Sequence, residues 1–107
     1  MATSKITKTG NAVMQVFKTG SEIDTIFTIP ADYRGIMFID DTNTAFHGAW
    51  IIACGSTSSV YFSEIKGNTG ETISSPENGK LKITRYTERE LYVGFLSMTP
   101  DKTVIMS

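Results

Sequence analysis

Cysteine and histidine are scarce in this chain, which has one of each, Cys54 and His47. A single cysteine cannot form an intramolecular disulfide, and a zinc site needs several Cys or His ligands. If the segment between the two residues is a strand, they lie about 23 Å apart at ~3.3 Å per residue, on opposite faces. They therefore cannot act as a catalytic pair, and the apolar neighbours of Cys54 predict a buried thiol.

An excess of charge of one sign is also lacking, because ten Lys and Arg residues balance eleven Asp and Glu residues to a net charge of −1. Nucleic acid and anionic membranes are bound by clustered positive charge, so neither is expected as a partner. No stretch approaches the ~18 apolar residues of a membrane span, and the N-terminus has no apolar segment of a signal peptide. We expect a protein made in the cytoplasm, without membrane insertion.

Turn-forming residues occur in clusters at intervals of roughly 8–12 residues, the spacing typical of an all-β protein. The segments between the clusters are rich in Ile, Val, Phe, Tyr and Thr, and several alternate with period two. In 80–84, for example, Leu81 and Ile83 share one face, and no segment has the 3.6-residue repeat of a helix. The sequence predicts an all-β fold in one domain over 1–107, a small antiparallel β-sandwich, jelly-roll-like, with eight or nine strands.

Two local patterns refine this prediction. The pair Asn78-Gly79 can adopt the positive φ angles of a tight turn, which predicts a hairpin between 71–74 and 80–86. The runs 36–39 and 50–54 are apolar on both faces, whereas an antiparallel sheet with one face in water is polar there. A loop or terminus of the same chain could cover the second face, or a subunit interface of a homo-oligomer could.

Motifs for catalysis or for cofactor binding are not found. The chain has no glycine-rich phosphate-binding motif. The acidic turn 40–45 has oxygen ligands at Asp41 and Asn43, but Ala45 follows and no later Glu completes a calcium loop, which favours a structural turn. Carboxylates such as Asp32, Asp41 and Glu64 could still meet in space, which leaves an enzyme acting on polysaccharide as a remote alternative. We expect no metal, no cofactor and no enzymatic activity.

The candidate ligand-binding residues are polar and aromatic side chains near turns. Aromatic faces and short hydrogen-bonding side chains suit sugar rings, although each of these residues could instead serve packing or turn formation. The candidates are Tyr33, Asp41, Asn43, His47 and Trp50, and Arg34 and Tyr86 share the same setting.

A family resemblance adds to these observations. The succession TIFTIPADYRGIMFID, HGAWIIACGSTSSVYFSEI, ETISSPENGKLKITRY and ELYVGFLSM resembles the C-terminal head domains of bacteriophage tail fibres and receptor-binding proteins. The likeness extends from about Thr25 to Met98 and lies in a loose order of strands and turns, with no fixed binding residue to transfer.

The resemblance implies a small jelly roll that assembles as a homotrimer in a virion tail and binds a bacterial surface saccharide or protein. It thus implies a non-enzymatic receptor-binding or adhesion domain. The alternative is a structural module for virion assembly or decoration, whose partners are other virion proteins. A receptor-binding domain is expected to have an exposed cleft with aromatic and hydrogen-bonding residues, whereas an assembly module is expected to have a broad apolar patch.

Overall fold

The computed structural model describes residues 13–42, 47–68, 71–85, 90–99 and 101–107, with Asn68 described by its backbone alone. The strands are β1 (Val13–Lys18), β2 (Asp24–Thr28), β3 (Arg34–Asp41), β4 (His47–Cys54), β5 (Val60–Asn68), β6 (Thr72–Ser74), β7 (Lys80–Thr84), β8 (Leu91–Ser97) and β9 (Ile105–Met106). No described segment forms a helix long and apolar enough to cross a membrane. The predicted all-β fold is confirmed.

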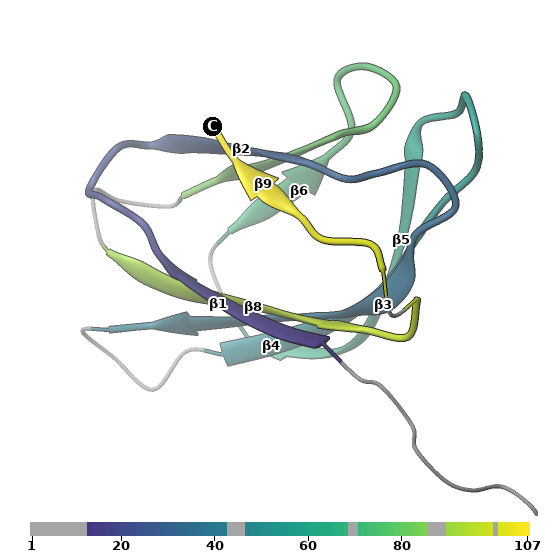
Figure 1. Cartoon of the computed structure of the whole chain (residues 1–107). Coiled ribbons are helices and arrows are strands. Elements are labelled where there is room, and N and C mark those ends of the chain that lie inside the picture. Colours follow the sequence, from purple (N-terminus) through teal and green to yellow (C-terminus); the bar gives the residue numbers. More distant parts are fainter. Residues whose placement is uncertain (1–12, 43–46, 69–70, 86–89, 100) are drawn as a thin grey trace, which may run out of the picture.

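The nine strands of the described residues pair in two antiparallel sheets. One sheet has the order β1-β8-β3-β4-β5 and the other has the order β6-β7-β2-β9. Figure 1 shows the sheets as two layers, with β2, β6 and β9 above and β1, β8, β3 and β4 below. The pairing of β1 with β8 and of β2 with β7 nests early strands beside late ones, as in a jelly roll. The middle differs, because β3, β4 and β5 follow one another as a meander.

The core lies between the two layers and follows the alternation in the sequence. In β7, Leu81 and Ile83 are fully buried, as their period-two spacing predicts. Rings from three strands meet edge to face at the centre: Phe17, Phe27 and Phe95 have centroids 5.1 to 6.1 Å apart. Because these rings belong to β1, β2 and β8, they connect the two sheets.

The predicted hairpin is confirmed between β6 and β7, but its connection is longer than a two-residue turn. Five residues, 75–79, join the strands, and of the pair Asn78-Gly79 only Gly79 has a positive φ, 73°. The Asn78 amide donates to the carbonyl of Thr57 at 2.8 Å, and Ser75 Oγ accepts from the amide of Val60 at 3.0 Å. Contacts with the β4–β5 segment therefore set the conformation of this loop.

Candidate functional site

Two of the predicted ligand-binding residues, Tyr33 and Trp50, lie in the core. Tyr33 is fully buried and Trp50 is 6% exposed. The Trp50 ring lies over Gly48 of the same strand, where an added Cβ would come within 2.6 Å of a ring carbon. In this arrangement neither aromatic side chain presents a face to solvent on which a sugar ring could stack.

The other predicted residues do not gather in one cleft. Asp41 is buried at the end of β3, and His47 is exposed at the start of β4. Arg34 is exposed at the opposite end of β3, where its Nη1 donates to the carbonyls of Tyr33 and Cys54 at 3.0 and 3.1 Å. Asn43 and Tyr86 lie outside the described residues.

The carboxylates considered for polysaccharide chemistry are spread over the sandwich. Asp32 precedes β3 and Asp41 ends it, so the length of this eight-residue strand, about 27 Å, separates them. Glu64 lies on β5, two strands away from β3 in the sheet. Among the described residues, no group of three or more His, Cys, Asp or Glu side chains is placed to hold a metal ion.

Cys54 is buried, as predicted, and occupies the end of β4 opposite His47. Burial raises the pKa of its thiol above the ordinary value of 9.0, Asp32 raises it further, and Arg34 partly offsets the rise. Because the thiolate is the reactive form, burial and the raised pKa both disfavour reaction at this cysteine.

The main surface feature is the outward side of the five-stranded sheet. Strand register aligns its apolar side chains in two rows that cross β1, β8, β3 and β4. The first row is Met14, Leu96, Ile36 and Ile51, and the second is Val16, Gly94, Phe38 and Ala49. We call these two rows the outer face. Val16 is 63% exposed, Met14 52%, Ile51 49% and Phe38 39%, so the described parts of the chain leave them uncovered.

Polar residues border the outer face at both ends of the strands. At one end a third row consists of Lys18, Tyr92, Asp40 and His47. At the other end Arg34 lies beside Ala53, next to the exposed side chains of Tyr61 and Met98. Charged side chains thus stand beyond the apolar rows at both ends of the strands, as at the rim of a protein interface, and at the Arg34 end they alternate with apolar ones.

The outward side of the four-stranded sheet provides an internal comparison. Its paired positions on β2 and β7 include Thr28 with Lys80 and Asp24 with Thr84, and the Lys80 ammonium donates to Thr28 Oγ1 at 2.8 Å. The middle pair is Ile26 with Lys82, and Ile105 of β9 is exposed beside Thr28, so this outward side is mixed, whereas that of the five-stranded sheet has two continuous apolar rows. The prediction that 36–39 and 50–54 are apolar on both faces is confirmed, since Ile36, Phe38 and Ile51 lie on the outward side of the sheet.

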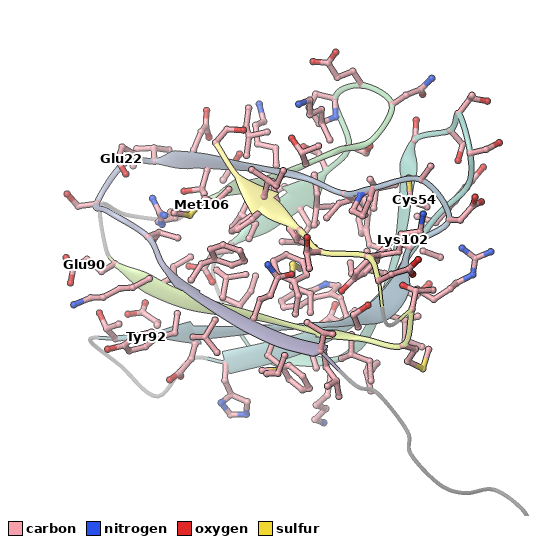
Figure 2. The ribbon with its side chains drawn as sticks, in the orientation of Figure 1. Glu22, Cys54, Glu90, Tyr92, Lys102 and Met106 are labelled. Carbon is pink, nitrogen blue, oxygen red and sulfur yellow. The ribbon has the colours of Figure 1, made fainter. Side chains whose placement is uncertain are left out.

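A polar pocket of about 440 Å³ lies on the other side of the molecule, near the β1–β2 connection and β9. Its lining includes Glu22, Asp24, Thr25, Met106 and Ser107. Figure 2 shows Glu22 and Met106 at the upper layer, away from Tyr92 at the lower one. The volume falls within the range of small-molecule sites, and its carboxylates and hydroxyls can hydrogen-bond a polar ligand.

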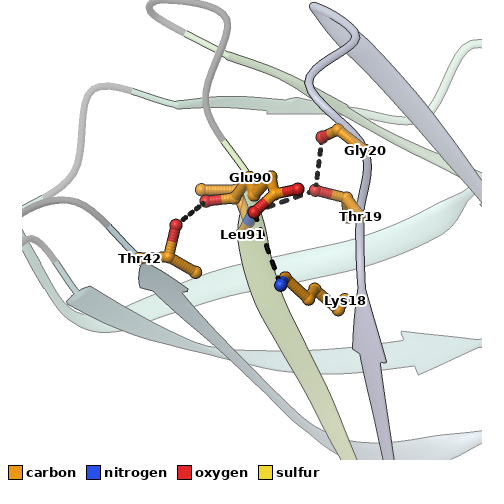
Figure 3. Close-up of polar contacts among 6 residues, drawn as sticks. All are labelled: Lys18, Thr19, Gly20, Thr42, Glu90 and Leu91. Carbon is orange, nitrogen blue, oxygen red and sulfur yellow. Dashed lines mark hydrogen bonds and ion pairs between the residues drawn. The ribbon is translucent and has the colours of Figure 1, made fainter.

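Thr19, at the edge of this pocket, is held rigidly between β1 and β8. Its backbone amide donates to the carbonyl of Leu91 at 2.9 Å, and its Oγ1 accepts from the amide of Leu91 at 3.0 Å. The same hydroxyl donates to the carbonyl of Gly20 at 3.0 Å, and Lys18 forms an ion pair with Glu90 at 3.5 Å (Figure 3). This network ties the pocket edge to the start of β8.

A buried cation lies behind the pocket. Arg85 is 4% exposed, and its Nη2 donates to Thr25 Oγ1 at 2.6 Å, while its buried Nε and Nη1 have no hydrogen-bond partner among the described residues. Burial lowers the pKa of its guanidinium, and the carboxylates of Glu22, Glu71 and Asp24 partly offset this effect. The positive charge is thus balanced by carboxylates, two of which line the pocket.

Sequence reasoning missed most of the outer face, because Met14, Val16 and Leu96 become neighbours of Ile36 and Ile51 only through strand register. The alternation of exposed and half-buried positions in β1 could have indicated its outward residues. Comparison of the chain with models of known families, with curated proteins and with solved structures finds no match.

Proposed function

We propose that the protein is a non-enzymatic structural module that functions as a homo-oligomer and buries its outer face against further copies of the chain. The observation that carries this proposal is the pair of apolar rows across four adjacent strands, uncovered by the described residues. The largest contiguous apolar patch on a protein surface is often an interaction site. The outward side of the other sheet is mixed, with charged residues beside Ile26 and Ile105, and has no such continuous rows in the described residues.

A role in virion assembly agrees with two observations, the family resemblance and the apolar outer face. The order of strands and turns resembles fibre head domains, and a broad apolar patch is the feature expected of an assembly module. A receptor-binding domain would be expected instead to have a cleft lined by aromatic and hydrogen-bonding residues, and the polar pocket has no aromatic residue in its lining. The assembly alternative therefore has the stronger support.

The test is the solution mass of the protein by light scattering across a dilution series, starting from the 11.7 kDa chain. The wild type should be larger than a monomer at high concentration. Ile51→Lys should be monomeric, because it places a charge within an apolar row of the outer face. Ile51 is half exposed, so this change should cost little stability.

The matched control is Thr72→Lys, which adds the same charge at an exposed position of β6 in the other sheet. This variant should associate as the wild type does. A wild type that stays monomeric at every concentration, or an Ile51→Lys variant that still associates fully, would overturn the proposal.

Adhesion to a bacterial surface saccharide is a second candidate function, favoured by the polar pocket. Carboxylates at Glu22 and Asp24 beside the Thr25 hydroxyl suit the hydroxyl groups of a sugar. The pocket lies on the opposite side from the outer face, so it stays open when that face is buried. An oligomer would then present several weak sites together and gain affinity through effective concentration.

Binding to a panel of purified bacterial cell-wall polysaccharides tests this candidate. Asp24→Asn should weaken any binding that is detected, because the amide replaces one acceptor oxygen by a donor group. Asp101→Asn, at an exposed turn away from the pocket lining, should leave binding unchanged. No binding by the wild type, or equal binding by Asp24→Asn, would exclude the pocket as a saccharide site.

A further inference from the structure

The outer face has a charge pattern that changes sign from one end of the central strand to the other. β3 is the third of five strands in its sheet. Its outward positions are, in order, Arg34, Ile36, Phe38 and Asp40, so a cation and an anion flank two apolar residues. Arg34 and Asp40 are both exposed, and Nη1 of Arg34 is held by two backbone carbonyls at its end of the strand.

Consider two copies that contact each other through their outer faces and are related by a two-fold axis. This axis must lie in the plane between the two contacting sheets. An axis parallel to the strands would put each row of one copy on the same row of the other. With the axis over β3, the middle strand of the sheet, Arg34 would then meet Arg34, and Asp40 would meet Asp40. Like charges brought together at an interface disfavour association, so this arrangement is opposed by the charges of the protein itself.

An axis that runs across the strands, between the two apolar rows, reverses the order of the rows. Each β3 then lies over the other β3, and Arg34 of each copy meets Asp40 of the other. The apolar residues also change partners, so that Ile36 meets Phe38 and Ala49 meets Ile51. A small side chain opposite a large one allows the two faces to interdigitate at the ~10 Å spacing of packed sheets.

The area of the outward side of the sheet is close to that of a stable dimer interface. The whole outward side of the sheet, which comprises the outer face, the two rows that border it and β5, has five strands about 4.8 Å apart and four residue rows about 6.8 Å apart. It covers roughly 650 Å², close to the ~800 Å² per partner of a stable interface. A cyclic trimer, by contrast, would use two different patches at each interface, because its contacts are head to tail. The reversal of charge within a single patch fits an isologous pair.

We infer that the partner of the outer face is a second copy of this chain, related by a two-fold axis across the strands, with reciprocal Arg34–Asp40 ion pairs at the two ends of the interface. This inference rests on the proposed self-association and specifies its geometry. It departs from the homotrimer that the family resemblance implies. The apolar rows drive association, and the ion pairs select the orientation of the two sheets.

Charge reversal provides the test, with dimer dissociation constants measured by analytical ultracentrifugation. Arg34→Glu and Asp40→Lys should each raise the dissociation constant about tenfold or more, because each places like charges together at both ends of the interface. The double variant Arg34→Glu/Asp40→Lys should regain most of the lost affinity. A mixture of the two single variants should also form a heterodimer, in which each end has one Glu–Lys or one Asp–Arg pair.

Glu77→Lys, in the exposed β6–β7 loop, is the matched charge reversal and should leave the dissociation constant unchanged. Circular dichroism of the monomers at high dilution checks that each variant is folded. If Arg34→Glu does not fold, the test rests on Asp40→Lys. A dissociation constant that neither charge reversal changes, or a wild type that forms a trimer, would overturn the two-fold geometry but would still support self-association. A wild type that is always monomeric would overturn self-association as well.

Discussion

Tyr33 is a core residue whose hydroxyl contributes little to the fold. The ring is fully buried, and its hydroxyl lies close to the site where Gly35 would have a Cβ, at 2.7 Å. The nearby Ser97 hydroxyl donates to the carbonyl of Thr99 at 2.8 Å and accepts the amide of Thr99 at 3.1 Å, and no described residue forms a hydrogen bond of good geometry with the buried Tyr33 hydroxyl. Burial raises the pKa of the phenol above its ordinary value of 10.0, and Ser97 partly offsets the rise.

Replacing Tyr33 by Phe should therefore be neutral or should stabilise the protein by up to ~1 kcal/mol, because it removes an unpaired buried hydroxyl and keeps the ring. Urea denaturation measures this difference. A loss of more than ~1 kcal/mol would show that the hydroxyl has a partner, such as a buried water.

The raised pKa of Tyr33 also predicts that the stability of the protein depends on pH. The folded pKa of Tyr33 is raised, so the unfolded chain loses this proton first and the native state binds more protons above pH 10. Stability should therefore fall as the pH rises above 10, and Tyr33→Phe should fall less steeply than the wild type. Equal slopes for the two proteins would mean that Tyr33 ionises alike in both states.

At the scale of elements, the C-terminal segment is joined to β1 through one side chain. The Gln15 amide donates from Nε2 to the carbonyl of Val104 at 2.9 Å and accepts the amide of Val104 at Oε1 at 2.8 Å. The Gln15 side chain thus makes the pair of hydrogen bonds that a neighbouring strand would make. It does so between the two sheets, because β1 and β9 belong to different sheets. Val104 itself is buried, so this pair closes one side of the core.

Gln15→Leu should destabilise the protein by about 1–3 kcal/mol, because it leaves a buried amide and carbonyl without partners. Hydrogen exchange of the Val104 amide, followed by NMR, should become much faster than in the wild type. Gln15→Glu retains the acceptor for this amide and should protect it better than Gln15→Leu. Unchanged exchange in both variants would show that other contacts hold the segment.

At the scale of the whole molecule, association and folding should be linked. A partner that binds only the native state stabilises it by mass action. The melting temperature of the wild type should therefore rise with protein concentration, whereas that of Ile51→Lys should not. Differential scanning calorimetry over a wide concentration range measures both. A concentration-independent melting temperature in the wild type would contradict a dimer coupled to folding.

The sequence determined the class of fold and many of the core residues. Period-two alternation directs Leu81 and Ile83 inward whatever the topology, and turn residues at short intervals leave room only for strands. The same local reasoning predicted that Cys54 is buried and that 36–39 and 50–54 are apolar on both sides. These results depend on neighbours along the chain, which the sequence specifies directly.

Tertiary structure alone decided which surface residues lie together. Met14, Leu96, Ile36 and Ile51 form one row because β1, β8, β3 and β4 pair in a particular order and register, and a shift by one residue would turn each strand over. The same pairing separated the predicted binding residues, with Tyr33 and Trp50 in the core and Arg34 and His47 at opposite ends of the sheet. Pairing between distant strands depends on packing of the whole core, which no local pattern encodes.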